Sequence, residues 1–66
     1  MNKFPKGLQK VYVMADKCCK LLMMKEGLTA KTAEEIVLNA LKECDSDLKI
    51  GNYVKVETAL EMKFVK

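Results

Sequence analysis

The reactive groups of the chain are three cysteine thiols, at Cys18, Cys19 and Cys44. A cysteine attacks as its thiolate, which a neighbouring histidine or other base normally generates. The chain contains no histidine, and only Lys17 and Lys20 place positive charge beside the adjacent pair. We therefore predict that the cysteines act as small hydrophobic residues and that the protein is not an enzyme.

Metal and cofactor sites are not indicated by the sequence. Structural zinc sites need Cys₄ or Cys₂His₂ spacing, which two adjacent cysteines and one distant cysteine do not provide. Asp45-Ser46-Asp47 begins like a calcium-binding loop, but the glycine and glutamate of such a loop are missing at the later positions. We expect no metal and no cofactor.

Size and composition predict one small domain over residues 1–66. Half of the residues are hydrophobic, but only two tyrosines and two phenylalanines are present, and tryptophan is absent. The core of such a chain is thin, and association with a partner is a common source of extra stability. The odd cysteine count and the lack of a long apolar run predict a cytoplasmic protein with reduced thiols that does not enter a membrane.

Two helices are predicted after a loose lead-in over residues 1–6. The first covers residues 7–26, where apolar residues recur at helical spacing, and Gly27 follows at the position where a glycine often ends a helix. The second covers residues 32–45. Thr32 and Glu35 have the spacing of a capping box, and Thr29 is an alternative, earlier cap. The short connection predicts an antiparallel helical hairpin.

The C-terminal segment, residues 48–66, has a different pattern. From Val54 to Phe64, apolar and polar residues alternate with a period of two, which is typical of a strand. Gly51 and Asn52 are a candidate hairpin turn. We therefore predict an α+β fold, in which the two-helix hairpin is followed by a β-strand or β-hairpin. The alternative is a small all-α three-helix bundle whose third helix is capped by Asn52.

A strand of this length needs a second strand, because an unpaired edge exposes its backbone. Folding the segment back on itself opposes Lys55 to Lys63, whereas pairing two copies about a two-fold axis at Thr58 opposes Lys55 to Glu61. We therefore predict a homodimer on a shared sheet, with an intramolecular sheet using residues 48–50 as the alternative. The predicted dimer interface comprises Val54, Val56, Thr58, Leu60, Met62, Phe64, Lys55 and Glu61.

Apolar residues on the polar side of the first helix indicate a surface for another protein. Methionine side chains adapt to partners of different shape. We predict a non-enzymatic protein-interaction module of the inhibitor or adaptor type, a kind of small protein common among phage and mobile-element products. The predicted partner surface comprises Val13, Met14, Leu21 and Met24.

A lysine stripe on the same helix favours an alternative function, as a nucleic-acid-binding accessory protein. Lys6, Lys10, Lys17 and Lys20 recur at helical spacing and are suited to contact phosphates. All 12 basic residues are lysines. Because arginine is the residue of bidentate base recognition, we expect weak, salt-sensitive binding without sequence specificity.

Part of the chain resembles the opening helix–turn–helix–strand unit of the histone-like DNA-bending proteins. The resemblance lies in Gly27-Leu28-Thr29 and in the later run Ile50-Gly51-Asn52-Tyr53, with Ala33, Val37 and Ala40 between them. It implies a helical hairpin that leads into a strand. The Arg-rich, Pro-tipped arm of that family is absent, so we do not assign the chain to it.

Overall fold

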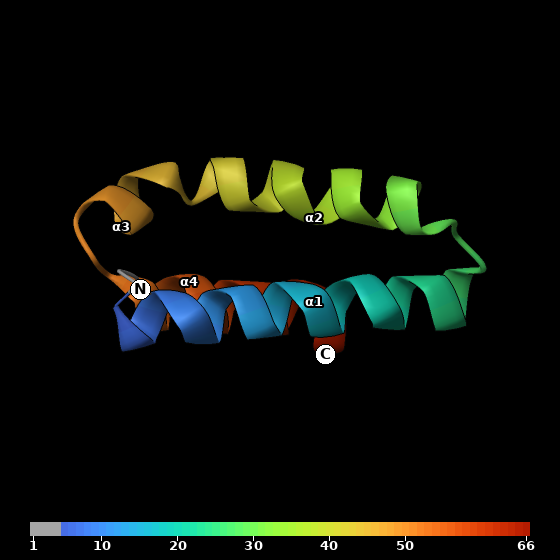
Figure 1. The fold of residues 1–66 in the computed structure, drawn as a ribbon, viewed down its shortest axis with the longest axis horizontal. Coiled ribbons are helices and arrows are strands. Elements are labelled where there is room, and N and C mark those ends of the chain that lie inside the picture. The colour runs from blue at the N-terminus through green and yellow to red at the C-terminus, as the bar shows by residue number, and fades with distance from the viewer. Residues whose placement is uncertain (1–4) are drawn as a thin grey trace.

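The computed structural model describes residues 5–66, and these residues fold entirely through helices (Figure 1). Along the chain these are α1 (Lys6–Glu26), α2 (Ala30–Glu43), α3 (Asp45–Lys49), α4 (Tyr53–Leu60) and a π-helical turn, η1 (Glu61–Val65). No strand occurs in residues 5–66. The predicted α+β class is therefore wrong, and the structure fits the all-helical alternative.

The first helix, α1, begins one residue before its predicted start and ends where the sequence predicts. Pro5 precedes it, and the backbone N–H of Gln9 donates to the Pro5 carbonyl over 3.1 Å. Most of the predicted lead-in, residues 1–4, lies outside the described residues. At the other end Gly27 has a φ of 68°, a left-handed conformation that glycine adopts without a steric cost.

The second helix, α2, begins two residues before its predicted start because Thr29, and not Thr32, caps it. The backbone N–H of Thr32 donates to the Thr29 hydroxyl over 3.2 Å. This bond satisfies one of the N–H groups that a helix start leaves without a partner. In Figure 1, α2 runs back along α1, which confirms the predicted antiparallel hairpin.

A short helix and a turn connect α2 to α4. Helix α3 includes Leu48, where the predicted extended segment begins. Gly51, with a φ of 79°, and Asn52 then form a turn. The turn is at the predicted place, but it joins two helices and not two strands.

Residues 53–65 form a helix because their large apolar side chains also recur at helical spacing. Tyr53, Val56, Leu60 and Phe64 follow one another at intervals of three, four and four residues, so on a helix they share one face. Val56 and Leu60 are fully buried, and Tyr53 and Phe64 pack against them. A helix also satisfies its backbone hydrogen bonds internally, whereas a strand needs a second strand. Asn52 stands at the N-cap position, as the alternative predicts, without a side-chain capping bond to α4.

The central element of the core is α1. It packs against α2 and against α4 with η1, while α2 and α4 touch each other little. Helix α4 runs parallel to α1 and lies behind it in Figure 1. Most of the buried side chains are small, as the composition predicts, so burial of apolar area stabilises the fold only modestly. Within residues 5–66 the buried set is Val11, Cys18, Ala33, Val37, Ala40, Val56 and Leu60.

Candidate functional site

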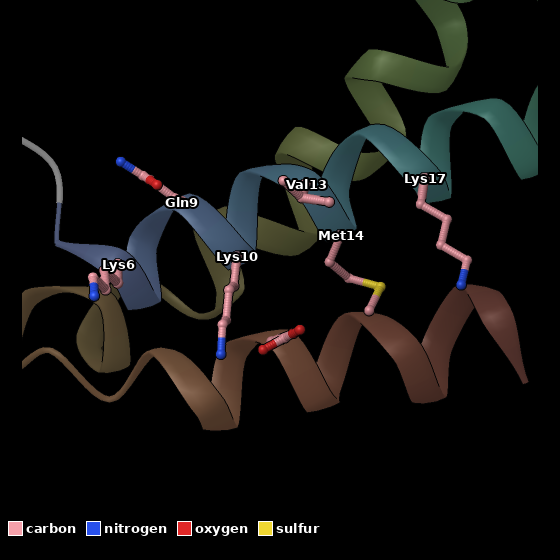
Figure 2. Close-up of a pocket in the computed structure, with 7 residues that line it drawn as sticks. Lys6, Gln9, Lys10, Val13, Met14 and Lys17 are labelled. Atoms are coloured by element: carbon pink, nitrogen blue, oxygen red, sulfur yellow. The ribbon is translucent and has the colours of Figure 1, made fainter. Parts of the chain in front are cut away.

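An open groove with a volume of about 520 Å³ lies between α1 and α4, and we call it the α1–α4 groove. Figure 2 shows Lys10, Met14 and Lys17 extending from α1 toward α4, whereas Gln9 points away from α4. The lining residues are Lys6, Gln9, Lys10, Val13, Met14 and Lys17 of α1 and Glu57 of α4.

The register of α1 separates this groove from the core. Val11 and Cys18, seven residues apart, are fully buried on the inner face of the helix. Lys6, Val13 and Lys17 follow intervals of seven and four residues, which bring side chains onto one stripe of a helix. All three are exposed. The local sequence of α1 therefore sets lysine and apolar side chains beside one another on its outer face.

The charge of the groove is positive. Three lysines and one glutamate give its lining a formal charge of +2. Lys6, Lys10 and Lys17 form no ion pair with any carboxylate of the described residues. The fourth lysine of the predicted stripe differs, because Lys20 pairs with Asp16 over 3.2 Å and does not line the groove. The positive charge of the groove is thus not neutralised by ion pairs within the described residues.

The predicted partner surface is only partly brought together. Val13 is 70% exposed and Met24 is 81% exposed, while Met14 and Leu21 are half-buried. Val13 and Met14 line the α1–α4 groove, but Leu21 and Met24 do not. The two surfaces predicted for protein and for nucleic acid therefore overlap in a single groove, where Val13 and Met14 lie among the lysines.

The predicted shared-sheet interface is wrong. Its residues belong to α4 and η1, and helical geometry divides them between the core and the surface. Val56 and Leu60 are buried, and Phe64 packs against the core. Val54 and Met62 are exposed, at 73% and 62%. Of the polar members, Lys55 and Thr58 are exposed and Glu61 is half-buried. The homodimer itself stays a prediction.

The cysteines occupy apolar surroundings. Cys18 is buried, and its thiol donates to the Leu60 carbonyl over 3.8 Å. Burial raises the pKa of the Cys18 thiol, and Cys19 adds to the rise while Lys17 opposes it. Burial also raises the pKa of the Cys19 thiol, and the nearby carboxylates of Glu34 and Asp16 raise it further. A raised pKa keeps a thiol protonated at neutral pH, so both are weak nucleophiles.

Sequence reasoning missed Glu57, the α4 residue of the groove. A strand over residues 54–64 puts Glu57 on a charged face with no fixed relation to α1. The helical spacing of Tyr53, Val56, Leu60 and Phe64 was the signal that could have placed it. No sequence pattern indicated that Gln9 would line the groove.

A second hollow, of about 310 Å³, lies between α1 and α2. Tyr12 and Leu38 are its exposed apolar members, at 47% and 54%. Asp16 and Glu34 lie in its lining, so its charge is opposite to that of the α1–α4 groove. The full lining is Tyr12, Ala15, Asp16, Cys19, Glu34, Val37, Leu38 and Leu41.

Within residues 5–66, no three side chains of the metal-binding types His, Cys, Asp and Glu are grouped so that they could hold an ion. Among the described helices, none has the length and apolar character needed to cross a membrane.

The fold and the groove together define a small all-helical domain with a lysine-lined apolar groove. No protein-family model matches the chain, and no similar protein was found among the curated proteins or the solved structures.

Proposed function

We propose that this protein is a small binding module of the inhibitor or adaptor type, which holds a segment of another protein in the α1–α4 groove. One observation carries the proposal. The groove combines Val13, 70% exposed, and Met14 with three lysines that have no carboxylate partner in residues 5–66. An apolar centre with a polar, charged rim is the usual composition of a protein-binding surface.

The apolar residues supply the affinity in this proposal. Covering exposed apolar surface releases about 25 cal/mol per Å², and Val13 offers most of its side chain for such burial. Met14 adds a flexible, polarizable side chain that adjusts to the shape of its partner. The lysines around them steer an oppositely charged partner and fix its orientation.

Nucleic-acid binding is a second candidate, favoured by Lys6, Lys10 and Lys17 on one side of α1, which have no carboxylate partner in the part of the chain that the structure describes. Against it stands Lys20, the fourth lysine of the predicted stripe, because it already pairs with Asp16. A gel shift with DNA and RNA at low salt tests this candidate directly.

Selection of random peptides displayed on phage tests the proposed function. The matched variants are Val13→Asp in the groove and Val54→Asp on α4, since the two valines are almost equally exposed, at 70% and 73%. We expect peptides recovered on the wild-type chain to bind Val54→Asp normally and to bind Val13→Asp about tenfold more weakly or worse. Peptides that respond to neither variant, or only to Val54→Asp, contradict the proposal.

A further inference from the structure

We infer that the partner segment is an acidic amphipathic α-helix, which lies along the α1–α4 groove with its carboxylates over the α1 lysines and its apolar side chains on Val13 and Met14. The inference rests on the proposed function and names the chemistry of the ligand.

The charges of the α1–α4 groove are complementary to an acidic segment. Lys6, Lys10 and Lys17 all belong to α1, and none forms an ion pair within the described residues. The single carboxylate of the lining, Glu57, belongs to α4. A bound segment therefore meets positive charge on its α1 side and negative charge on its α4 side. Carboxylates fit only the α1 side, so the charge also sets the orientation of the segment.

The spacing of the three α1 lysines fits a helical partner. Lys6, Lys10 and Lys17 are separated by four and seven residues, which corresponds to about 6 Å and about 10 Å along the axis at 1.5 Å per residue. A helix lying along α1 has the same rise and repeat, so its side chains at intervals of four and seven residues can face all three lysines.

An extended segment does not match this spacing. Its residues rise about 3.3 Å each and alternate between two faces. The distance from Lys6 to Lys10 then corresponds to two residues of the extended segment, whose side chains lie on the same face. The distance from Lys10 to Lys17 corresponds to three residues, so the side chains that would meet these two lysines lie on opposite faces. A strand can thus address two of the lysines, whereas a helix can address three.

Apolar side chains line the groove between two of its lysines. Val13 and Met14 lie between Lys10 and Lys17 in the sequence of α1, and all four line the groove. A segment that pairs with both lysines therefore passes over apolar side chains between its carboxylates. Phosphates offer charge without apolar side chains, and so this arrangement favours an amphipathic protein helix over a nucleic acid.

The test measures binding of the peptides recovered by phage display, synthesised with a fluorescent label and titrated with the full chain. The charge variant is Lys10→Glu with Lys17→Glu. Its matched control is Lys31→Glu with Lys55→Glu, which changes the net charge equally at two exposed lysines outside the groove. We expect about a tenfold loss of affinity for the groove variant and less than about a twofold change for the control.

The sequences of the recovered peptides give a second readout. We expect Asp or Glu to be enriched together with Leu, Ile or Phe at intervals of three and four residues, and circular dichroism to show helix forming on binding. Added salt should weaken the binding, because the lysines are exposed.

Each contrary outcome has a distinct meaning. Peptides that need Val13 but are neutral or basic overturn the acidic-helix inference and leave the proposed function standing. A library that yields no peptide dependent on Val13 overturns both. A DNA duplex that displaces the peptides and fails to bind the groove variant overturns the inference in favour of nucleic acid. If Lys10→Glu with Lys17→Glu lowers the solution mass of the chain, the acidic-helix inference is overturned, and a second copy of the chain is the occupant of the groove.

Discussion

Gly7, in the first turn of α1, lies against the ring of Tyr53, the first residue of α4. A β-carbon at Gly7 would lie 2.7 Å from the ring atom Cδ2 of Tyr53 and 3.0 Å from its Cβ. The missing side chain thus allows the N-terminal ends of the two parallel helices to approach. This close approach lies beside the α1–α4 groove, because Lys6, the neighbour of Gly7, lines that groove.

Replacing Gly7 by alanine should destabilise the protein, although alanine is the better helix former. The gain in helix propensity is about 1 kcal/mol at most, whereas forcing a methyl group against Tyr53 costs about 1–3 kcal/mol. We expect a net loss of about 1 kcal/mol in the free energy of unfolding, measured by urea titration. In a Tyr53→Ala background the same substitution should become neutral or stabilising. A stabilising Gly7→Ala in the wild-type chain would contradict the contact.

A second substitution tests the end of α1. Gly27 has a φ of 68°, and apart from its own atoms and those of its chain neighbours, no atom of the described residues lies within 4 Å of the position that its β-carbon would take. Because the space is open, the effect of a substitution is purely conformational. Gly27→Ala should cost about 1–2 kcal/mol, and Gly27→Asn should cost less, since asparagine tolerates the left-handed region. Equal thermal midpoints for the two variants would argue against a left-handed helix end.

A matched pair of valines distinguishes the helix from the strand in residues 53–65. On a strand Val54 and Val56 share a face, but on α4 Val56 is 0% exposed and Val54 is 73% exposed. Val56→Ala should cost about 2 kcal/mol, from lost burial and the cavity left behind. Val54→Ala should stay within about 0.5 kcal/mol of the wild type. Equal costs in chemical denaturation would contradict α4.

The buried thiols predict a loss of stability in alkaline solution. The pKa values of Cys18 and Cys19 are raised in the folded chain, chiefly by burial. Below about pH 8.5, the ordinary pKa of a thiol, both states hold these protons and stability is unaffected. At higher pH the unfolded chain loses protons first, so the free energy of unfolding falls as pH rises.

The control for this prediction is a chain without the two thiols. Urea titrations from neutral pH to about pH 10, in reducing buffer, should show a shallower decline for Cys18→Ala with Cys19→Ala than for the wild type, since the difference reports the thiols alone. Parallel curves would show that these thiols do not titrate differently in the folded state.

Light scattering tests the homodimer that the sequence predicts. The expected mass is twice the chain mass of 7.5 kDa. Of the apolar residues in the predicted interface, Val54 and Met62 remain exposed, so Val54→Asp should lower the mass while Val13→Asp, in the groove, should not. A monomeric mass for the wild-type chain at all concentrations would contradict the predicted homodimer.

The N-terminal half of the fold could be predicted because its signals are local. The helical period of residues 7–26, Gly27 after it and Thr29 before α2 each act within a few residues, and they produced the correct antiparallel hairpin. The sequence also named Val13 and the lysines of α1, since a single helix orders them, but as two separate surfaces and not as one groove.

The C-terminal half could not be predicted in this way because residues 53–65 carry two patterns at once. The pattern with a period of two includes Val54 and Met62, but these side chains are exposed in the structure. The pattern with helical spacing includes Leu60, which is buried in the core, and Tyr53, which packs against the core. A strand needs a second strand that this chain does not provide in residues 5–66, whereas a helix satisfies its own backbone and finds an apolar face on α1. Only tertiary packing chose between them, and with that choice it placed Glu57 beside the lysines of α1.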